Sequence, residues 1–403
     1  MAEQERVMGW TVPDHVPPEL VVDIDIFNIP LKGADAATSW RCFQKGDNHL
    51  AFSPYNGGHW IATRGEDIPK LYRDFNHLSN DTIAVPSAGT RLLPIQANPP
   101  FHRVYRHNIN PMFSNEAVDA REDAIRTLTI ALVEGLKPKG ECEFVADFAL
   151  QLPLRIFLDM MGIDLTDLPY LREQVETFTQ HPDVNRKIAA AAALEAYLEK
   201  EIDDRIAHPR DDAVTRMVQA RFEDRPYTRD ETLQTCMMLM LGGLDTVANV
   251  LGFTAHHLAR HPEQRAYIRA NPDKMPVIVQ ELLRRFPAAN IAREVVEDWD
   301  YRGVLMKKGD TILLPVSLYN MDPERLENPD EVDLTRETPH ITFGSGRHTC
   351  AGALLARKEI GIFLEEWLTR IPDFHVDPDR PPVFTVGAAN SAQRVWLKWD
   401  VPA

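Results

Sequence analysis

The sequence predicts a mainly helical fold with a minor β part, and two observations predict it. From Pro99 to about Pro287, apolar residues recur at the i, i+3 and i+4 spacing of amphipathic helices. Before and after this stretch, short alternating apolar runs lie between turn residues, as strands do. No internal repeat or low-complexity linker divides the chain of 403 residues, so we expect a single domain covering residues 1–403.

The expected elements follow the chain in order. Residues 11–64 predict loops and edge strands, such as the run 58–63, and β-rich portions return at about 288–320 and 380–400. The helical portion covers about 65–287 and 350–370. Within it, periodicity predicts these helices: 117–136, 144–161, 185–207, 229–260, 273–286 and 350–370. Late strands are expected at 311–315 and 394–399.

Composition and charge exclude several classes of function. Hydrophobic residues make up 44% and charged residues 26%, an ordinary globular mixture. The 44 basic and 60 acidic side chains give a net charge of −16 without any Lys/Arg-rich run, so nucleic acids and acidic membranes are poor partners. The first 20 residues lack the apolar core of a signal peptide, and the longest apolar stretch, around 236–244, falls short of the roughly 20 residues that span a bilayer. We expect a soluble protein.

Cysteine usage points the same way. The four cysteines form no C-x-x-C pair, so a structural zinc site is not expected. So few cysteines in so long a chain argue against a disulfide framework and favour a reducing compartment, the cytoplasm. Cys42, Cys142 and Cys236 are interpreted as packing residues.

The segment 342–353, TFGSGRHTCAGA, differs from the rest of the chain. Its glycines allow tight turns and close backbone approach. Cys350 stands at the head of a predicted helix, where unpaired amide groups favour a thiolate that could ligate iron. For an isolated cysteine, the alternative of an ordinary small buried residue would stand.

Residues 343–352, FGSGRHTCAG, resemble the haem-binding signature of the cytochrome P450 family, F-x-x-G-x-[HR]-x-C-x-G, at every fixed position. The resemblance implies a triangular helical prism with haem b between a long oxygen-binding helix and the helix that carries the cysteine. It implies that Cys350 supplies the proximal thiolate to the haem iron, that Phe343 packs beside it, that His348 reaches a propionate, and that Gly352 completes the cofactor site. A thiolate pushes electron density onto iron and favours O–O cleavage.

A second motif lies about one hundred residues earlier, in the predicted helix 229–260. Gly242-Gly243-Leu244-Asp245-Thr246 resembles the oxygen-activation motif of the family, [AG]-G-x-[DE]-T. On helical spacing, one face carries Met238, Gly242, Asp245 and Asn249. A glycine pair in a helix can also serve simple packing or a bend. The resemblance implies that the two glycines leave a groove for dioxygen, that Thr246 hydrogen-bonds it, and that Asp245 relays protons from solvent.

A third motif is the i, i+3 pair Glu281 and Arg284, which alone would be an ordinary surface pair. It matches the E-x-x-R of the family, which implies a buried ion network important for haem seating. A second arginine should close this network. Arg325 and Arg336 are both candidates, and Arg336 is favoured because it follows the stretch PDEVDLT.

Haem propionates are anions and need cationic partners. The run PPFHRVYR begins a predicted helix at a proline pair and places His102 and Arg106 at i, i+4, so both can face one ligand. This pair resembles the H-x-x-x-R propionate site of the family, and Arg293 matches a further propionate-binding arginine.

Order, spacing and length match the soluble bacterial members, and the segments quoted above are similar to the camphor-hydroxylating branch, the CYP101-like enzymes. That resemblance implies reduction by a small acidic [2Fe–2S] ferredoxin, which an NADH-dependent ferredoxin reductase serves. A local basic patch would suit such a partner despite the net charge. Its candidates are Arg103, Arg106, Arg347 and Arg357. We expect a monomer.

The substrate is less specified. Camphor-hydroxylating enzymes place a tyrosine in the loop before the propionate helix, whereas residues 85–96, VPSAGTRLLPIQ, contain none, which argues against camphor. Candidate wall residues are mostly apolar and several are small: Thr90, Leu92, Ile95, Met238, Leu241, Ala289 and Ala388. A hydrocarbon with one keto or hydroxyl group fits such a wall, so terpenoids or norisoprenoid ketones are the leading class.

The main hypothesis is a haem-thiolate monooxygenase that hydroxylates such a substrate with O2. Two alternatives stay open. One is a peroxide-using or non-oxygenating haem-thiolate enzyme, which the intact pair Asp245-Thr246 disfavours. The other is a non-catalytic haem sensor, which would not need Thr246.

Overall fold

The computed structural model describes residues 12–31, 35–87, 91–180, 183–387 and 389–401. The chain forms two compact units, each assembled from three separate segments. The first unit comprises Met1–Ser87, Gly252–Cys350 and His375–Trp396. The second comprises Ala88–Leu251, Ala351–Phe374 and Leu397–Ala403. The single-domain organisation therefore stays a prediction, and each unit is described by itself.

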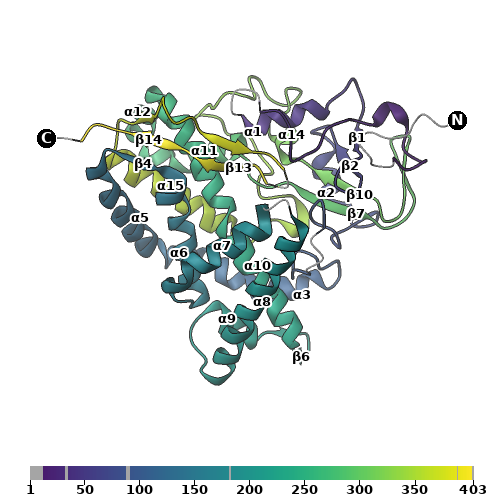
Figure 1. Cartoon of the computed structure of the whole chain (residues 1–403), viewed down its shortest axis with the longest axis horizontal. Coiled ribbons are helices and arrows are strands. Elements are labelled where there is room, and N and C mark those ends of the chain that lie inside the picture. The colour runs from purple at the N-terminus through teal and green to yellow at the C-terminus, as the bar shows by residue number, and fades with distance from the viewer. Residues whose placement is uncertain (1–11, 32–34, 88–90, 181–182, 388, 402–403) are drawn as a thin grey trace. The chain divides into compact units, whose positions relative to one another are not determined.

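The first unit holds the largest sheet, of which Figure 1 labels β1, β2, β7 and β10. The strands of the first unit, inside and outside this sheet, are β1 (Leu50–Ser53), β2 (His59–Ala62), β3 (Leu78–Ser79), β7 (Ile291–Val295), β8 (Trp299–Tyr301), β9 (Val304–Met306), β10 (Thr311–Leu314), β11 (His375–Val376), β12 (Val383–Thr385) and β13 (Ser391–Arg394). Its helices and helical turns are η1 (Pro18–Leu20), α1 (Ala36–Ser39), η2 (Trp40–Phe43), α2 (Ile68–Arg73), α12 (Pro262–Ala270), η7 (Pro272–Lys274), α13 (Met275–Arg285), α14 (Val316–Asn320) and η8 (Gly346–His348).

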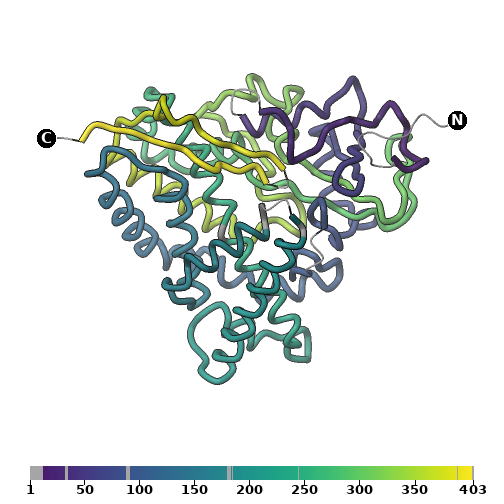
Figure 2. The backbone as a smooth tube through the Cα atoms, in the orientation of Figure 1, coloured from purple at the N-terminus to yellow at the C-terminus, as the bar shows by residue number. Residues whose placement is uncertain are grey.

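The large sheet has five strands in the order β1-β2-β10-β7-β3. Strand β2 pairs antiparallel with β1 and parallel with β10, so Trp60 lies opposite Ile312, and both side chains are fully buried. Figure 2 shows the early strands beside the later green ones, although about 250 residues separate Trp60 from Ile312 along the chain. The expectation of edge strands before residue 64 is wrong for β2, because β10 pairs with its second side.

The second unit is mainly helical (Figure 1). Its helices and helical turns are α3 (His102–Ile109), η3 (Asn110–Phe113), α4 (Asn115–Asp119), α5 (Glu122–Leu136), η4 (Lys137–Lys139), the π-helical turn η5 (Val145–Ala149), α6 (Gln151–Met161), η6 (Leu165–Asp167), α7 (Leu168–Gln180), α8 (Val184–Ala207), α9 (Ala213–Val218), α10 (Arg229–Leu244) and α15 (Ala353–Arg370). Its strands are β4 (Glu141–Glu143), β5 (Arg221–Phe222) and β6 (Arg225–Pro226). Helix α11 (Thr246–Arg260) and strand β14 (Trp396–Lys398) cross the boundary between the units.

Helix α15 packs against α5 in the second unit, and an aromatic cluster continues this core. The ring of Trp367 packs in T-shaped geometry with Phe144 and Phe148, at centroid distances of 5.0 and 5.2 Å. At the surface, Lys358 Nζ lies 2.6 Å from Glu122 Oε2. These contacts hold the helix that follows Cys350 in the sequence.

Most expected helices are present, but their boundaries differ. The helix expected at 117–136 is split into α4 and α5, the one at 144–161 begins with a π-helical turn, and the one at 273–286 begins at Met275 after a 3-10 turn. The strand expected at 394–399 is β14, which starts at Trp396. Helices α7 and α12 were not predicted.

The segment Arg229–Arg260 is long and apolar enough to cross a membrane by length and composition, with a mean hydropathy of 1.5, contrary to the expectation that this stretch falls short. More than half of its most apolar window is buried within the structure. The buried core helix of a folded domain meets the same criteria, so this segment is weak grounds for a membrane span.

Candidate functional site

Cys350 ends a tight loop that begins at Phe343. The Cys350 N–H donates to the carbonyl of Phe343 over 2.9 Å, which closes the loop on itself. Two glycines make this path possible, since Gly344 and Gly346 have φ angles of 78° and 81°, which other residues rarely adopt. Helix α15 begins at Ala353, with Gly352 as its N-cap. The helix therefore starts three residues after Cys350, and the expectation that it starts at Cys350 is wrong.

The four cysteines differ in accessibility. Cys142 and Cys236 are buried, and burial raises the pKa of the Cys236 thiol to about 12 and raises that of Cys142 further. Both therefore stay protonated and inert. Cys42 is half-buried, whereas Cys350 is exposed and forms no disulfide, so the Cys350 thiol is the most accessible of the four.

A hydrogen-bonded chain anchors the residues that precede the loop. The Asn320 side chain accepts from Ile341 N over 3.0 Å and donates to Thr342 Oγ1 over 2.8 Å. The Thr342 hydroxyl in turn donates to the carbonyl of Leu283 on α13 over 2.7 Å. The start of the Cys350 loop is thereby fixed to helix α13. Sequence analysis did not single out Asn320, because no motif contains it.

Glu281 and Arg284 form a buried bidentate pair on α13, with nitrogen to oxygen distances of 2.7 and 2.8 Å. Arg284 also donates to the carbonyl of Asn320 over 3.0 Å. Arg336 Nε lies 3.3 Å from Glu281 Oε1, whereas the Arg325 guanidinium stacks 3.6 Å from the ring centre of Tyr319. The structure thus brings together Glu281, Arg284 and Arg336, the favoured alternative.

Two aromatic residues, Tyr72 of α2 and Phe75 in the turn after it, lie beside the loop, and sequence analysis did not predict them as part of the site. The Phe75 ring lies 5.7 Å from the ring of His348, and the Arg347 guanidinium lies 5.5 Å from the Phe75 ring centre. A Cβ atom at Gly344 would stand 3.8 Å from the ring of Tyr72, which is van der Waals contact.

Arg293 stands on strand β7, only 2% exposed, with its guanidinium 5.2 Å from the ring centre of Tyr72. Its side chain donates to the carbonyl of Ala292, and within the described residues it forms no ion pair. Burial lowers the pKa of this guanidinium to about 10. A buried cation without a counter-ion is costly, so this position suits an anionic ligand.

His102 and Arg106 both lie on α3 in the second unit, so they share one helix face. His102 is buried and Arg106 is half-buried. The helix begins at His102, two residues after the proline pair from which it was expected to start.

The expected helix 229–260 is broken in the middle of its motif. Helix α10 ends at Leu244, Asp245 lies outside regular helix with φ −118° and ψ −36°, and α11 begins at Thr246. The Asp245 carbonyl still accepts from Asn249 N over 3.1 Å. The expected helix is therefore interrupted at one residue, Asp245 and Thr246 stand at the break, and the shared face of Met238, Gly242, Asp245 and Asn249 stays a prediction.

The two glycines before the break have different surroundings. Gly242 is exposed, and a Cβ there would meet only the terminal methyl of Met238, at 3.1 Å. A Cβ at Gly243 would lie 2.3 Å from the Phe157 ring of α6. Gly243 therefore lets α6 approach closely, while Gly242 faces open space.

The candidate substrate wall is described in part. Thr90 and Ala388 lie outside the described residues. Leu92 is buried, and Ile95, Met238, Leu241 and Ala289 are half-buried. The neighbouring Leu93 N–H donates to the Gln234 carbonyl over 3.4 Å, so the loop of Leu92 lies against α10 one turn before Met238.

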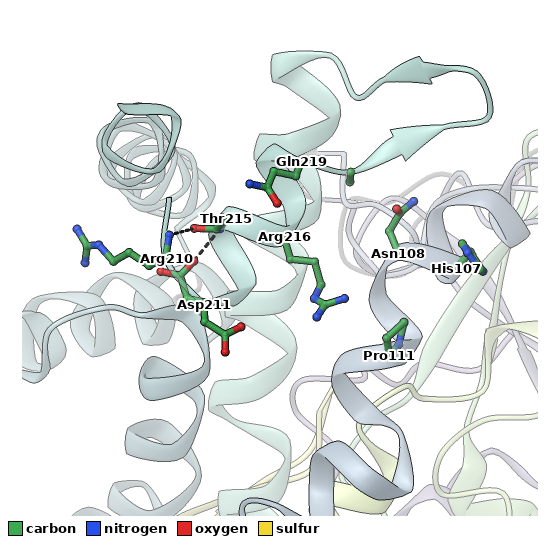
Figure 3. A pocket seen from close by; sticks show the side chains of 10 residues that line it. His107, Asn108, Pro111, Arg210, Asp211, Thr215, Arg216 and Gln219 are labelled. Atoms are coloured by element: carbon green, nitrogen blue, oxygen red, sulfur yellow. Dashed lines mark hydrogen bonds between the residues drawn. The ribbon is translucent and has the colours of Figure 1, made fainter. Parts of the chain in front are cut away.

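A hollow of about 400 Å³ opens elsewhere in the second unit, between the C-terminal part of α3 and the segment around α9 (Figure 3). Its lining is largely polar and charged and includes His107, Asn108, Arg210, Asp211, Arg216 and Gln219. None of the candidate wall residues lines it. Such a lining suits neither a hydrocarbon nor a haem.

Comparisons with known proteins identify the family. The family model described as Cytochrome P450 matches residues 170–386. The chain is 32% identical over 409 residues to "Probable cytochrome P450 127A1" of Sinorhizobium fredii, covering 98% of this chain and 99% of that protein. It is 33% identical to "Nocardicin C N-oxygenase" of Nocardia uniformis, covering 82% and 86%.

Solved structures agree. The crystal structure of CYP101J2 matches with a TM-score of 0.89 and 37% identity, covering 97% of this chain and 100% of the other. The crystal structure of CYP101C1 matches with a TM-score of 0.88 and 38% identity, at the same coverage. Enzymes of this family use dioxygen and a redox partner, and their haem b carries a thiolate ligand. The accessible Cys350 thiol and the uncompensated Arg293 cation fit such a group. This chain belongs to the cytochrome P450 family and is a haem-thiolate monooxygenase.

Proposed function

We propose that the enzyme hydroxylates a small hydrophobic substrate, a terpenoid or norisoprenoid ketone, with O2 and electrons from a [2Fe–2S] ferredoxin in the cytoplasm. The observation that carries the proposal is the closed loop from Phe343 to Cys350, which presents an accessible thiol. The hydrogen bonds through Asn320 and Thr342 fix this loop to α13.

Four cationic or hydrogen-bonding side chains would hold the haem propionates: His102, Arg106, Arg293 and His348. Cys350 would be the metal ligand, with Phe343 and Gly352 beside it. Glu281, Arg284 and Arg336 would keep the segment before the loop in place. When bound, a thiolate-ligated haem activates dioxygen, because the thiolate favours O–O cleavage.

The break between α10 and α11 supplies the groups that handle protons. Asp245 and Thr246 are half-buried and adjacent, so a carboxylate can exchange protons with solvent while a hydroxyl holds one at Oγ1. Gly242 would keep the space beside them open for dioxygen, since a Cβ at this position would meet nothing but the flexible terminal methyl of Met238. The packing of Gly243 against Phe157 supports a different role for that glycine.

The substrate class rests on the apolar wall residues rather than on relatives. Relatives carry names as different as "Nocardicin C N-oxygenase" and "Steroid C26-monooxygenase" of Mycolicibacterium smegmatis, so the family shares its chemistry but not its substrate. Leu92, Ile95, Met238 and Leu241 offer aliphatic surface, which suits a hydrocarbon with few polar groups.

The first experiment uses the haem-loaded protein. Reduction under carbon monoxide should give the red-shifted band of a thiolate-bound haem, and Cys350→His should lose it. Terpenoid and norisoprenoid ketones should shift the ferric spin state, and hydroxylated product should form with NADH, ferredoxin reductase and ferredoxin. A wild-type protein without the red-shifted band overturns the proposal.

The second experiment separates the monooxygenase from a haem sensor or a peroxide-using enzyme. Thr246→Ala should leave the carbonyl band intact but divert NADH from product to hydrogen peroxide, because a proton-holding hydroxyl is lost. Unchanged product yield per NADH would contradict the assigned role of Thr246.

The third experiment concerns the ferredoxin. Arg103 is exposed on α3 and is not among the proposed haem partners, so Arg103→Glu probes docking alone. The substitution should weaken ferredoxin-supported reduction and make it less sensitive to salt, since a rim charge acts mainly on association. Lys139→Glu, which exchanges a surface charge outside the candidate patch, serves as the control. Equal rates for both variants would reject docking at Arg103.

A further inference from the structure

We propose that Phe157 is a positioning residue for the Asp245–Thr246 pair, and that Gly243 is glycine in order to admit its ring. The inference rests on the proposed function insofar as this pair handles protons. All four residues belong to the second unit. Phe157 lies on α6, far from the motif in the sequence and without any motif of its own.

The contact is steric and specific to one glycine. A Cβ at Gly243 would lie 2.3, 2.5 and 2.8 Å from Cδ2, Cγ and Cε2 of Phe157, distances that real Cβ atoms do not show. These atoms form the body of a ring, not the end of a flexible chain. Phe157 is 5% exposed, so packing around it limits its escape. Any larger residue at 243 must move either the ring or helix α10.

The neighbouring glycine, Gly242, makes no comparable contact with a ring. A Cβ at Gly242 would meet only the terminal methyl of Met238, at 3.1 Å, which can rotate away. Gly242 therefore tolerates a small side chain sterically, and its proposed value is the open space beside it. The two glycines serve two purposes: one leaves room for a reactant, and the other leaves room for a ring of the protein.

The Phe157 ring packs at the end of α10, directly before the residues proposed to handle protons. Helix α10 ends at Leu244, one residue beyond Gly243, and Asp245 and Thr246 follow at once. A ring seated against the last turn of α10 fixes where that turn ends, and so fixes the start of the break. Displacement of this turn would move the carboxylate and the hydroxyl together.

Helix α6, which carries Phe157, is itself anchored to other elements of the second unit. Its C-cap Gly162 has φ 68°, and the Gly162 carbonyl accepts from the Arg205 guanidinium over 2.6 Å. Arg205 is buried and also pairs with Asp212 over 2.7 Å. The helix that carries Phe157 is thus tied to α8 and to the start of α9, and the ring can act as a fixed reference for α10.

The test is a double-mutant cycle of Gly243→Ala and Phe157→Ala in the haem-loaded enzyme. Gly243→Ala alone should lower Tm by several degrees and raise the share of NADH that ends as hydrogen peroxide. In the Phe157→Ala background, the space left by the ring accepts the new methyl, so Gly243→Ala should add little to either quantity. Gly135→Ala on α5, where a Cβ meets nothing within 4 Å, is the matched control and should not lower Tm.

Phe157→Leu keeps an apolar side chain of intermediate size and should give an intermediate peroxide share. A mispositioned proton donor should slow product formation by about tenfold in Phe157→Ala, and the solvent deuterium isotope effect on turnover should rise. Equal loss of Tm from Gly243→Ala in both backgrounds overturns the packing claim. A Phe157→Ala enzyme with lower Tm but wild-type product yield and isotope effect overturns the positioning claim. If wild-type enzyme forms no product, the proposed function fails by itself, and the Tm cycle still decides the packing claim.

Discussion

At the scale of single residues, the contacts of each side chain distinguish two arginines that are both candidates on sequence alone. Arg325 and Arg336 are both arginines downstream of the E-x-x-R pair, yet Arg325 stacks on Tyr319 and donates to its carbonyl, while Arg336 reaches Glu281. Glu281 has two cationic neighbours in a buried setting and needs both, because a buried carboxylate is costly unless its charge is balanced.

Arg336→Gln should therefore destabilise the protein far more than Arg325→Gln. Leaving Glu281 short of one partner should cost about 3 kcal/mol of unfolding free energy, while loss of the Arg325 contacts should cost about 1 kcal/mol. Urea unfolding of the two haem-loaded variants measures the difference, and haem release should be faster for Arg336→Gln. Equal midpoints would contradict the assignment of Arg336 to the network.

At the scale of elements, helix α10 is defined at its first turn by a capping box. The Thr228 hydroxyl accepts from Glu231 N over 3.1 Å, and Glu231 Oε2 accepts from Thr228 N over 2.7 Å. The same carboxylate receives hydrogen bonds from Arg225 and from the Tyr105 hydroxyl, the latter over 2.7 Å. Arg225 is the main reason that the pKa of Glu231 is lowered to about 2.

This cap predicts an acid-sensitive element. Because the folded pKa of Glu231 lies below its ordinary value of 4.5, the carboxylate stabilises the fold above pH 4.5, and this stability is lost as pH falls towards 2. The contribution is on the order of 2 kcal/mol, and Thr228→Ala should remove about 1 kcal/mol at neutral pH. Unfolding free energies of wild type and Glu231→Gln between pH 5 and pH 2 test the prediction: the variant should show a shallower decline. Parallel pH curves would show that this carboxylate does not couple to unfolding.

Elements also show where sequence reasoning stops. The capping box and the apolar period predict that a helix begins near Arg229, but the period runs on through Asp245 and gives no sign of the break. The break region is shaped by contacts such as that of Phe157 with Gly243, which no local pattern encodes. Helix α12 was missed because its sequence is mostly polar and only Arg265 and Ile268 are buried.

At the scale of the whole molecule, the mainly helical class and the family were predictable, since periodicity and the segment 343–352 are local features of the sequence. The arrangement of the candidate wall residues was not predictable, because they come from segments far apart in the chain, some from loops and some from helix α10. Leu92 and Met238 illustrate this, because the hydrogen bond from Leu93 to Gln234 places their two segments side by side and no local sequence pattern indicates it.

The whole protein should lose stability in mild acid, and three histidines that are buried or half-buried predict the pH range. Burial lowers the pKa values of His59, His256 and His257 to about 4. Folded molecules therefore bind fewer protons than unfolded ones below pH 6.5, so unfolding becomes easier as pH falls from 6.5 towards 4. For His59, which is 1% exposed, the effect is up to about 3 kcal/mol. Thermal unfolding across this range should show a falling Tm, and His59→Phe should flatten the slope. A Tm that does not change between pH 6.5 and pH 4 would refute the prediction.

Arg293 carries a consequence for how the protein matures in the cell. The newly made chain must enclose a positive charge that its own described residues do not neutralise, and the tyrosine ring beside it offers only partial relief. We therefore expect completion of the fold and capture of the prosthetic group to be coupled events. Cells starved of haem should accumulate a less stable polypeptide that proteases cleave more readily. Small carboxylates in the growth medium should not replace the haem propionates as the counter-ion of Arg293.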